Sequence, residues 1–176
     1  GHGYGYSPGT QGAPVDEAGQ PVFHHIPPSF NAAQSDGERW RWLMVTAAEL
    51  DPGLDAQVQF TFASFLHQQF GVQTLSAYRH FFAGGHALKE DRSIRQDTGP
   101  YEVHTLTDSE TLAKLASGVK RFDLPAEFNY IRLFNAIARN SNQGYAHNAL
   151  RTLAQIYENR RLYDRALEYW IRYKKV

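Results

Sequence analysis

The sequence predicts an all-α fold in which antiparallel helical hairpins stack behind an extended N-terminal arm. Three observations lead to this prediction. Apolar residues recur at helical spacing over most of the chain after residue 37. Short segments rich in Gly, Pro or Asn separate these periodic stretches, so successive helices are expected to run antiparallel. Aromatic residues make up 14% of the 176 residues, which favours a packed core over a disordered chain.

The composition narrows the classes of function. Lys+Arg and Asp+Glu both number 18, so the formal net charge is zero and no bulk attraction to nucleic acid is expected. The chain has no cysteine, which excludes disulfides, thiol catalysis and cysteine-ligated zinc. That composition fits any compartment and leans towards a secreted or periplasmic bacterial protein. No stretch approaches the roughly 20 apolar residues of a membrane span.

Two regions are distinguished by composition. Residues 1–37 are rich in Gly and Pro and are predicted to form an extended arm. Two interpretations of the arm stay open: a disordered linker, or a segment that lies along the domain. In the second case its apolar anchors would be Val22, Phe23, Ile26 and Phe30. Residues 38–176 form the predicted helical domain, with residues 84–106 as an exposed insertion loop because they are charged and poor in large apolar side chains.

The helical domain opens with a predicted hairpin. Ser35 or Asp36 can cap a first helix near Glu38, and this helix ends before Pro52 because a residue preceding proline avoids the helical region. A second helix is predicted from about Leu54, and Gly71 ends it. The second helix carries one apolar stripe, formed by Val58, Phe62, Phe65, Leu66 and Phe70.

The middle of the chain gives weaker signals. A third helix is predicted over residues 74–82, and residues 101–105 could form a short strand or an extended loop. Thr107 followed by Glu110 matches a capping box, which predicts a helix. Its apolar face would comprise Leu112, Leu115, Ala116, Val119 and Phe122. Pro125 would then lie in the first turn of the next helix. The apolar residues of that helix are Phe128, Ile131, Phe134, Ile137 and Ala138.

The last hairpin, residues 144–176, has the most specific pattern. Its first helix reads Leu150-x2-Leu153-Ala154-x2-Tyr157, and its second reads Ala166-x3-Trp170. This spacing resembles the tetratricopeptide repeat, with Leu150 in place of the usual Trp. The resemblance covers about 30 residues, one repeat unit. It implies a right-handed solenoid of stacked hairpins.

In such a repeat, polar residues of the first helix line the concave groove. The resemblance therefore implies a peptide- or protein-binding site at Asn148, Arg151, Gln155, Glu158 and Asn159. These side chains supply hydrogen-bond donors and acceptors for an extended backbone, and Arg151 can bind a carboxylate with both arms. The alternative is an ordinary solvated helix face, or a face covered by the next repeat.

A second resemblance involves five short stretches spread along the chain. They are similar to a helical region of large alpha-2-macroglobulin-like proteins of planctomycete-type bacteria. The stretches are residues 38–42, 70–75, 104–106, 128–130 and 156–160. The resemblance implies a segment of a multidomain exported protein. The reactive thioester of that family requires a cysteine, so this segment would not hold it.

The sequence contains no recognisable residue pattern for catalysis or metal binding. The sequence has no Gly-x-Ser-x-Gly elbow and no phosphate-binding glycine loop, and its carboxylates fall mainly at helix ends and turns. The eight histidines are not spaced as metal ligands, so no metal or cofactor is expected. Trp40 and Trp42 could stack on bases, but a helix places them about 200° apart. One would then be in the core and the other would contact the arm or a neighbour.

Taken together, these patterns predict a non-catalytic protein–protein interaction or scaffold module. Its partner would be a protein, a peptide or a neighbouring domain of the same chain. The chain begins with Gly1, and its last helix runs to Val176 without a stop signal, so we expect a segment of a longer exported bacterial protein. The alternative is a purely structural spacer that positions neighbouring domains.

Overall fold

The structure, a computed structural model, describes residues 13–72, 102–115, 118–140 and 143–175. Most of these residues lie in helices, and a two-stranded antiparallel hairpin is the exception. The main elements are α1 (Asp36–Leu50), α2 (Asp55–Phe70), β1 (Glu110–Leu115), β2 (Gly118–Asp123), α4 (Tyr130–Asn140), α5 (Gln143–Asn159) and α6 (Tyr163–Tyr173). Short 3-10 turns cover Phe30–Ala32, Pro52–Leu54 and Val103–Thr105.

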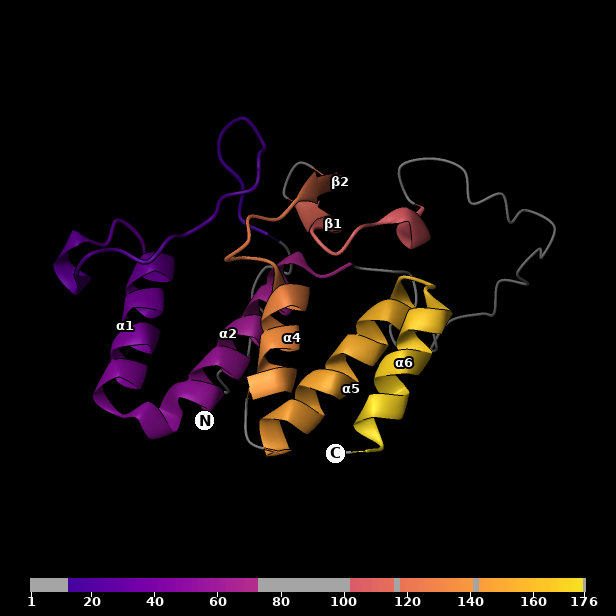
Figure 1. Cartoon of the computed structure of the whole chain (residues 1–176). Helices are drawn as coiled ribbons and strands as arrows, with labels where there is room; N and C mark the ends of the chain where they lie inside the picture. Colours follow the sequence, from indigo (N-terminus) through magenta and orange to yellow (C-terminus); the bar gives the residue numbers. More distant parts are fainter. Residues whose placement is uncertain (1–12, 73–101, 116–117, 141–142, 176) are drawn as a thin grey trace, which may run out of the picture.

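The helices stand side by side in chain order, and neighbouring helices run in opposite directions (Figure 1). α2 packs on α4, α4 on α5 and α5 on α6, whereas α1 contacts mainly α2. The β1–β2 hairpin lies beyond one end of α4, on the same side as the described part of the N-terminal arm (Figure 1). The predicted predominance of helix is therefore confirmed for the described residues.

The helix ends follow local sequence signals. The Ser35 side chain accepts a hydrogen bond from the Glu38 amide and caps α1, as predicted. α1 ends at Leu50, immediately before the Asp51–Pro52 pair, and α2 ends before Gly71. α4 starts at Tyr130, later than predicted, so Pro125 does not lie in its first turn. The Asn129 side-chain oxygen accepts from the Arg132 amide at 3.0 Å and caps the helix.

α5 ends in a backbone motif that the turn to α6 requires. Arg161 has φ 59°, in the left-handed region. The Leu162 amide donates to the Tyr157 carbonyl and the Arg161 amide donates to the Glu158 carbonyl, each at 2.9 Å. This pair of hydrogen bonds is a Schellman motif, which satisfies two carbonyls at the helix end and reverses the chain direction.

The predicted helix over residues 107–122 is wrong, because β1 and β2 occupy this stretch. Only half of the predicted capping box forms: the Glu110 carboxylate accepts from the Thr107 amide at 2.9 Å, whereas the Glu110 amide donates to the Thr107 backbone carbonyl. This arrangement closes a turn that leads into β1. Gly118 begins β2 with φ 109°, a conformation that glycine adopts and other residues rarely do. A helix would have placed this glycine in its interior, at a cost of about 1 kcal/mol relative to Ala.

The core joins the helices to the hairpin and the arm. Buried apolar side chains from α2, α4, α5 and α6 form one cluster that also includes Leu115 of β1 and Ala13 of the arm. Phe23 of the arm packs against the rings of Phe70, Phe122 and Phe128. The described part of the arm therefore lies along the domain, although two of its predicted anchors, Ile26 and Phe30, are 49% and 41% exposed.

Some predictions fall wholly or partly outside the described residues. The predicted helix over residues 74–82 is one of these. The predicted exposed loop over residues 84–106 is described only from residue 102. In that described part Val103 and Leu106 are buried, together with Leu112 of β1, in a second small apolar cluster. The end of the predicted loop is thus packed, and residues 103–105 form a 3-10 turn rather than a strand.

Candidate functional site

The predicted binding residues share one exposed face of α5. Asn148, Arg151, Gln155, Glu158 and Asn159 are all exposed. Their spacing places them along the helix on the side away from its buried stripe. The face is partly committed to internal contacts, because the Glu158 carboxylate accepts from the Trp170 indole nitrogen at 2.7 Å. Asn159 borders a very small cavity beside Arg160.

The opposite face of α5 is fully packed. Leu150, Leu153, Ala154 and Tyr157 are all buried, and Ala166 of α6 is buried against them. Tyr169 rather than Trp170 is the buried aromatic residue of α6, and its ring stacks on Tyr157 with centroids 5.2 Å apart. The Ala166-x3-Trp170 spacing of the repeat predicts that Trp170 fills the core, but Trp170 is only partly buried and packs at the edge of the cluster.

Two arginines join the α5–α6 hairpin to the turn before β1. Arg160 is buried and donates to the Thr107 and Glu110 carbonyls and to the Tyr130 hydroxyl. Arg165 binds the Asp108 carboxylate with both nitrogens, at 2.7 and 2.8 Å. Burial raises the pKa of Asp108, but hydrogen bonds from Arg165 and Tyr157 outweigh it and hold the pKa below its usual value. These contacts hold the α5–α6 hairpin against the turn before β1.

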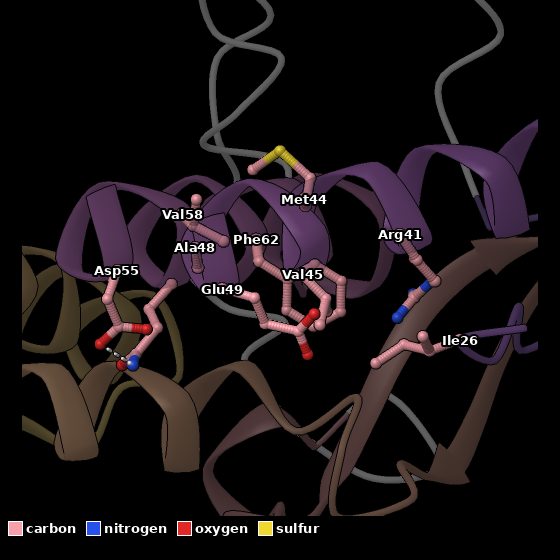
Figure 2. Close-up of a pocket in the computed structure, with 10 residues that line it drawn as sticks. Ile26, Arg41, Met44, Val45, Ala48, Glu49, Asp55, Val58 and Phe62 are labelled. Carbon is pink, nitrogen blue, oxygen red and sulfur yellow. Dashed lines mark hydrogen bonds between the residues drawn. The ribbon is translucent and has the colours of Figure 1, made fainter. Parts of the chain in front are cut away.

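A different kind of site lies between α1 and α2. The two helices enclose a cleft of about 330 Å³, shown in Figure 2. Most of its lining is apolar and comes from both helices and the arm: Ile26, Met44, Val45, Ala48, Val58 and Phe62. The volume is at the lower end of the range typical of small-molecule sites.

Arg41 lies at one end of this cleft, beside Ile26 (Figure 2). It is the buried residue of α1, with 3% of its surface exposed. Its guanidinium carbon is 4.6 Å from the Phe62 ring centroid and 4.4 Å from that of Phe128. Among the described residues no carboxylate or other hydrogen-bond acceptor pairs with this guanidinium. Burial lowers the pKa of Arg41 to about 10, partly offset by the charge of Glu127, so Arg41 stays protonated at neutral pH.

The nearby acidic residues are placed elsewhere. The Glu127 carboxylate binds the His25 ring at 2.5 Å, at the surface. Asp55 lies at the far end of the cleft and Glu49 between Asp55 and Arg41, and the Asp55 carboxylate accepts from the Gln59 amide at 2.7 Å (Figure 2). Glu49 is eight residues from Arg41 on α1, which corresponds to about 12 Å along the helix. The cleft therefore has a positive end and an acidic end.

The histidines within the described residues do not form a metal site. No group of three or more His, Asp or Glu side chains comes together there. His24 lies beside Ser35, with the ring nitrogen and the hydroxyl 3.1 Å apart. His67 of α2 lies against Tyr130 and Phe134, and burial, reinforced by the charge of Arg160, lowers its pKa to about 4.

Comparisons with family models, with curated proteins and with solved structures give no match for this chain. None of the helices that the structure describes has the length and apolar character to cross a membrane.

No motif in the sequence predicts the α1–α2 cleft. Arg41 lies between Trp40 and Trp42 in the sequence, and the structure places its guanidinium between the rings of Phe62 and Phe128. Trp42 contacts Phe30 of the arm, as predicted, but Trp40 is only half-buried and packs on Phe62 and Phe65 outside the core. The signal available in the sequence was the spacing of Arg41 with the apolar residues three, four and seven positions later. This spacing indicates an apolar helix face that carries one positive charge.

Proposed function

We propose that this chain is a non-catalytic protein–protein interaction or scaffold module with a tetratricopeptide-like, right-handed arrangement of its C-terminal helices. The row of antiparallel helices in chain order supports this proposal. The buried positions of α5 support it as well, together with Ala166 of α6, since they are ones at which the repeat needs small or apolar side chains; in α6 the buried aromatic residue is Tyr169 rather than Trp170. In keeping with the alpha-2-macroglobulin-like resemblance, the module would belong to a larger exported bacterial protein.

The observation that carries the proposal is the two-sided character of α5. One side is buried, while the other presents five polar side chains to solvent along about three turns of helix. Arg151, in the middle of this face, is exposed and can bind a carboxylate of a partner with both arms of its guanidinium. Asn148 and Gln155 flank it by about one turn on either side and can hydrogen-bond an extended backbone.

Selection of peptide ligands tests this proposal. Peptides that bind the immobilised chain would be selected from a random display library, and their affinities measured by fluorescence anisotropy. Arg151→Glu is expected to weaken binding about tenfold or more, because it replaces a charge-assisted hydrogen bond with repulsion. Gln155→Ala is expected to weaken it several-fold.

Lys175→Glu is the matched control, because it makes the same change in charge at an exposed residue beyond the end of α6. Its affinity should stay within about twofold of the unmodified chain. Equal binding by the unmodified chain, Arg151→Glu and Lys175→Glu would contradict the proposed site.

One observation favours the second candidate, a structural spacer. Tyr163, Leu167 and Ile171 lie four residues apart on α6 and are between 46% and 66% exposed. They form an apolar stripe that an adjoining helical unit of the same polypeptide could cover, as in stacked repeats. A photo-crosslinking residue at Leu167, introduced in the source cell, would distinguish the two candidates. A crosslink within the same polypeptide supports the spacer, and a crosslink only to a separate protein contradicts it.

A further inference from the structure

We propose that the cleft between α1 and α2 binds a small amphipathic carboxylate, with its apolar body along the cleft and its carboxylate on the guanidinium of Arg41. This site is separate from the α5 face and lies at the other end of the row of helices (Figure 1). The ligand class is defined by three features of the cleft: a buried cation, an apolar lining and a limited volume.

The buried cation is the first feature. Arg41 is 97% buried, yet within the described residues its guanidinium has neither an ion pair nor a hydrogen bond. Burying an unpaired charge is costly, and Arg carries five N–H donors. The rings of Phe62 and Phe128 offset part of this cost through cation–π contacts but accept none of the in-plane hydrogen bonds. The nitrogens of Arg41 are not fully enclosed, since among the described residues only Arg160 Nε is a fully enclosed side-chain nitrogen without a partner, and Arg41 lines the cleft. An anion in the cleft would therefore supply acceptors at this position.

The lining and volume of the cleft are the second and third features. Met44 and Val45 are the apolar side chains nearer Arg41, and Ala48 and Val58 continue the apolar wall towards the other end of the cleft (Figure 2). A volume of about 330 Å³ fits a short aliphatic or aromatic body but not a large lipid. Burial of such a body contributes about 25 cal/mol per Å² of apolar surface, and the guanidinium fixes its orientation.

The surrounding acidic residues favour a single negative charge on the ligand. Glu127 lies close enough for its charge to influence Arg41, and Glu49 and Asp55 line the rest of the cleft. A phosphate dianion would be repelled by these carboxylates and would lose more hydration energy on burial. A carboxylate carries one charge and matches the planar fork of the guanidinium.

Titration calorimetry with three eight-carbon probes tests the proposal. Octanoate carries the carboxylate, 1-octanol is its neutral analogue and octylammonium its cationic one. Octanoate is expected to bind about tenfold or more tightly than 1-octanol, because a hydrogen bond to a charged group contributes about 1.5–3 kcal/mol. Octylammonium is expected to bind more weakly than 1-octanol. Equal binding of octanoate and 1-octanol, or no binding of octanoate, would overturn the proposal.

Variants of the cleft assign the effect to Arg41. Arg41→Met replaces the charged guanidinium side chain with an unbranched apolar one and should abolish the preference for octanoate over 1-octanol. Arg39→Met, a partly exposed position that pairs with Asp36 on the same helix, should leave both affinities unchanged. Val45→Trp should fill the cleft and weaken both probes. A preference that persists in Arg41→Met would overturn the proposal, and if this variant does not fold, the comparison of the three probes on the unmodified chain decides.

This test is independent of the peptide experiment. Arg151→Glu should leave octanoate binding unchanged, and Arg41→Met should leave the α5 face intact. A negative result for one site therefore does not contradict the proposal for the other site. If only a peptide or protein carboxylate occupied the cleft, octanoate would fail to bind, and the small-molecule proposal would be rejected.

Discussion

α1 and α5 are of similar length, yet α5 buries its apolar residues whereas α1 leaves several of its own exposed. The apolar residues of α5 are buried against α4 and α6, and its polar residues face solvent. In α1 the buried residue is Arg41, while Leu43 is 50% and Leu50 82% exposed. α5 has a neighbouring helix on both sides, whereas α1 packs mainly on α2. The number of neighbours, rather than the apolar content of a helix, decides how much of it contributes to the core.

The largest expected effect comes from matched truncations in the two helices. Leu153→Ala in α5 should lower the free energy of unfolding by about 2–5 kcal/mol, because it leaves a cavity at a fully buried site. Leu43→Ala in α1 should change it by about 0.5 kcal/mol or less, as at other exposed positions. Urea denaturation of both variants measures the difference. Similar losses in the two would show that α1 is packed as tightly as α5.

The pH dependence of stability gives the next effect, at His67 of α2. An ordinary histidine pKa of 6.5 applies to the unfolded chain, and the folded value is about 4. Between these values the unfolded state binds more protons, so the free energy of unfolding falls as the pH is lowered from 6.5 to 4. The expected loss is about 3 kcal/mol.

His67→Phe should remove this part of the pH dependence, because the new ring cannot be protonated. His104→Gln, at an exposed position, should retain it. Urea midpoints measured from pH 7 to pH 4 provide the data. An identical slope in His67→Phe and the unmodified chain would rule out His67 as its source.

A smaller effect is expected from the ion pairs of the two regions. Asp108→Asn removes the bidentate contact with Arg165 and should cost about 1 kcal/mol, since both side chains are partly exposed and the pair is screened. Asp36→Asn removes the pair with Arg39 at a fully exposed carboxylate and should have no measurable effect. Thermal unfolding at low salt and at 1 M salt compares them. The cost of Asp108→Asn should shrink at high salt, and a cost that increases would contradict its ionic origin.

The smallest effect concerns the ends of the same two helices. Arg161→Gly at the end of α5 should raise the free energy of unfolding by about 0.5 kcal/mol, because glycine relieves the left-handed conformation but adds freedom to the unfolded chain. Asp51→Gly at the end of α1 should lower it, since Asp51 is extended and its carboxylate accepts from the Gly53 amide. Differential scanning calorimetry resolves both changes. A loss of stability in Arg161→Gly would mean that the side chain contributes more than the strain costs.

The sequence predicted the helices whose signals are local. The Ser35 cap, the end of α2 at Gly71 and the buried stripe of α5 each follow from a few neighbouring residues. Residues 107–122 were assigned wrongly because apolar spacing there fits both helix and strand, and the pairing of Thr111 with Phe122 is a tertiary choice. The choice of Tyr169 over Trp170 for the core depends on the angle at which α6 crosses α5, which spacing alone does not provide.

The two candidate sites also differ in whether local sequence signals predict them. Periodicity is sufficient to place Asn148, Arg151, Gln155, Glu158 and Asn159 on one exposed face of α5. The cleft depends on residues that are far apart in sequence, because Phe62 and Phe128 enclose Arg41 from α2 and from the turn before α4. Such an environment is created by folding and has no short motif.

The contact of the arm with the hairpin has a consequence for solubility. β1 pairs with β2 on one side, and Ala13 of the arm forms a parallel bridge to Leu115. The Lys120 ammonium group also donates to the Gly19 carbonyl, which holds a second part of the arm near the hairpin. An uncovered strand edge is a template for pairing with other chains. Proteolytic loss of the arm would therefore expose both this edge and the Phe70–Phe128 surface under Phe23, and favour self-association through β-strands.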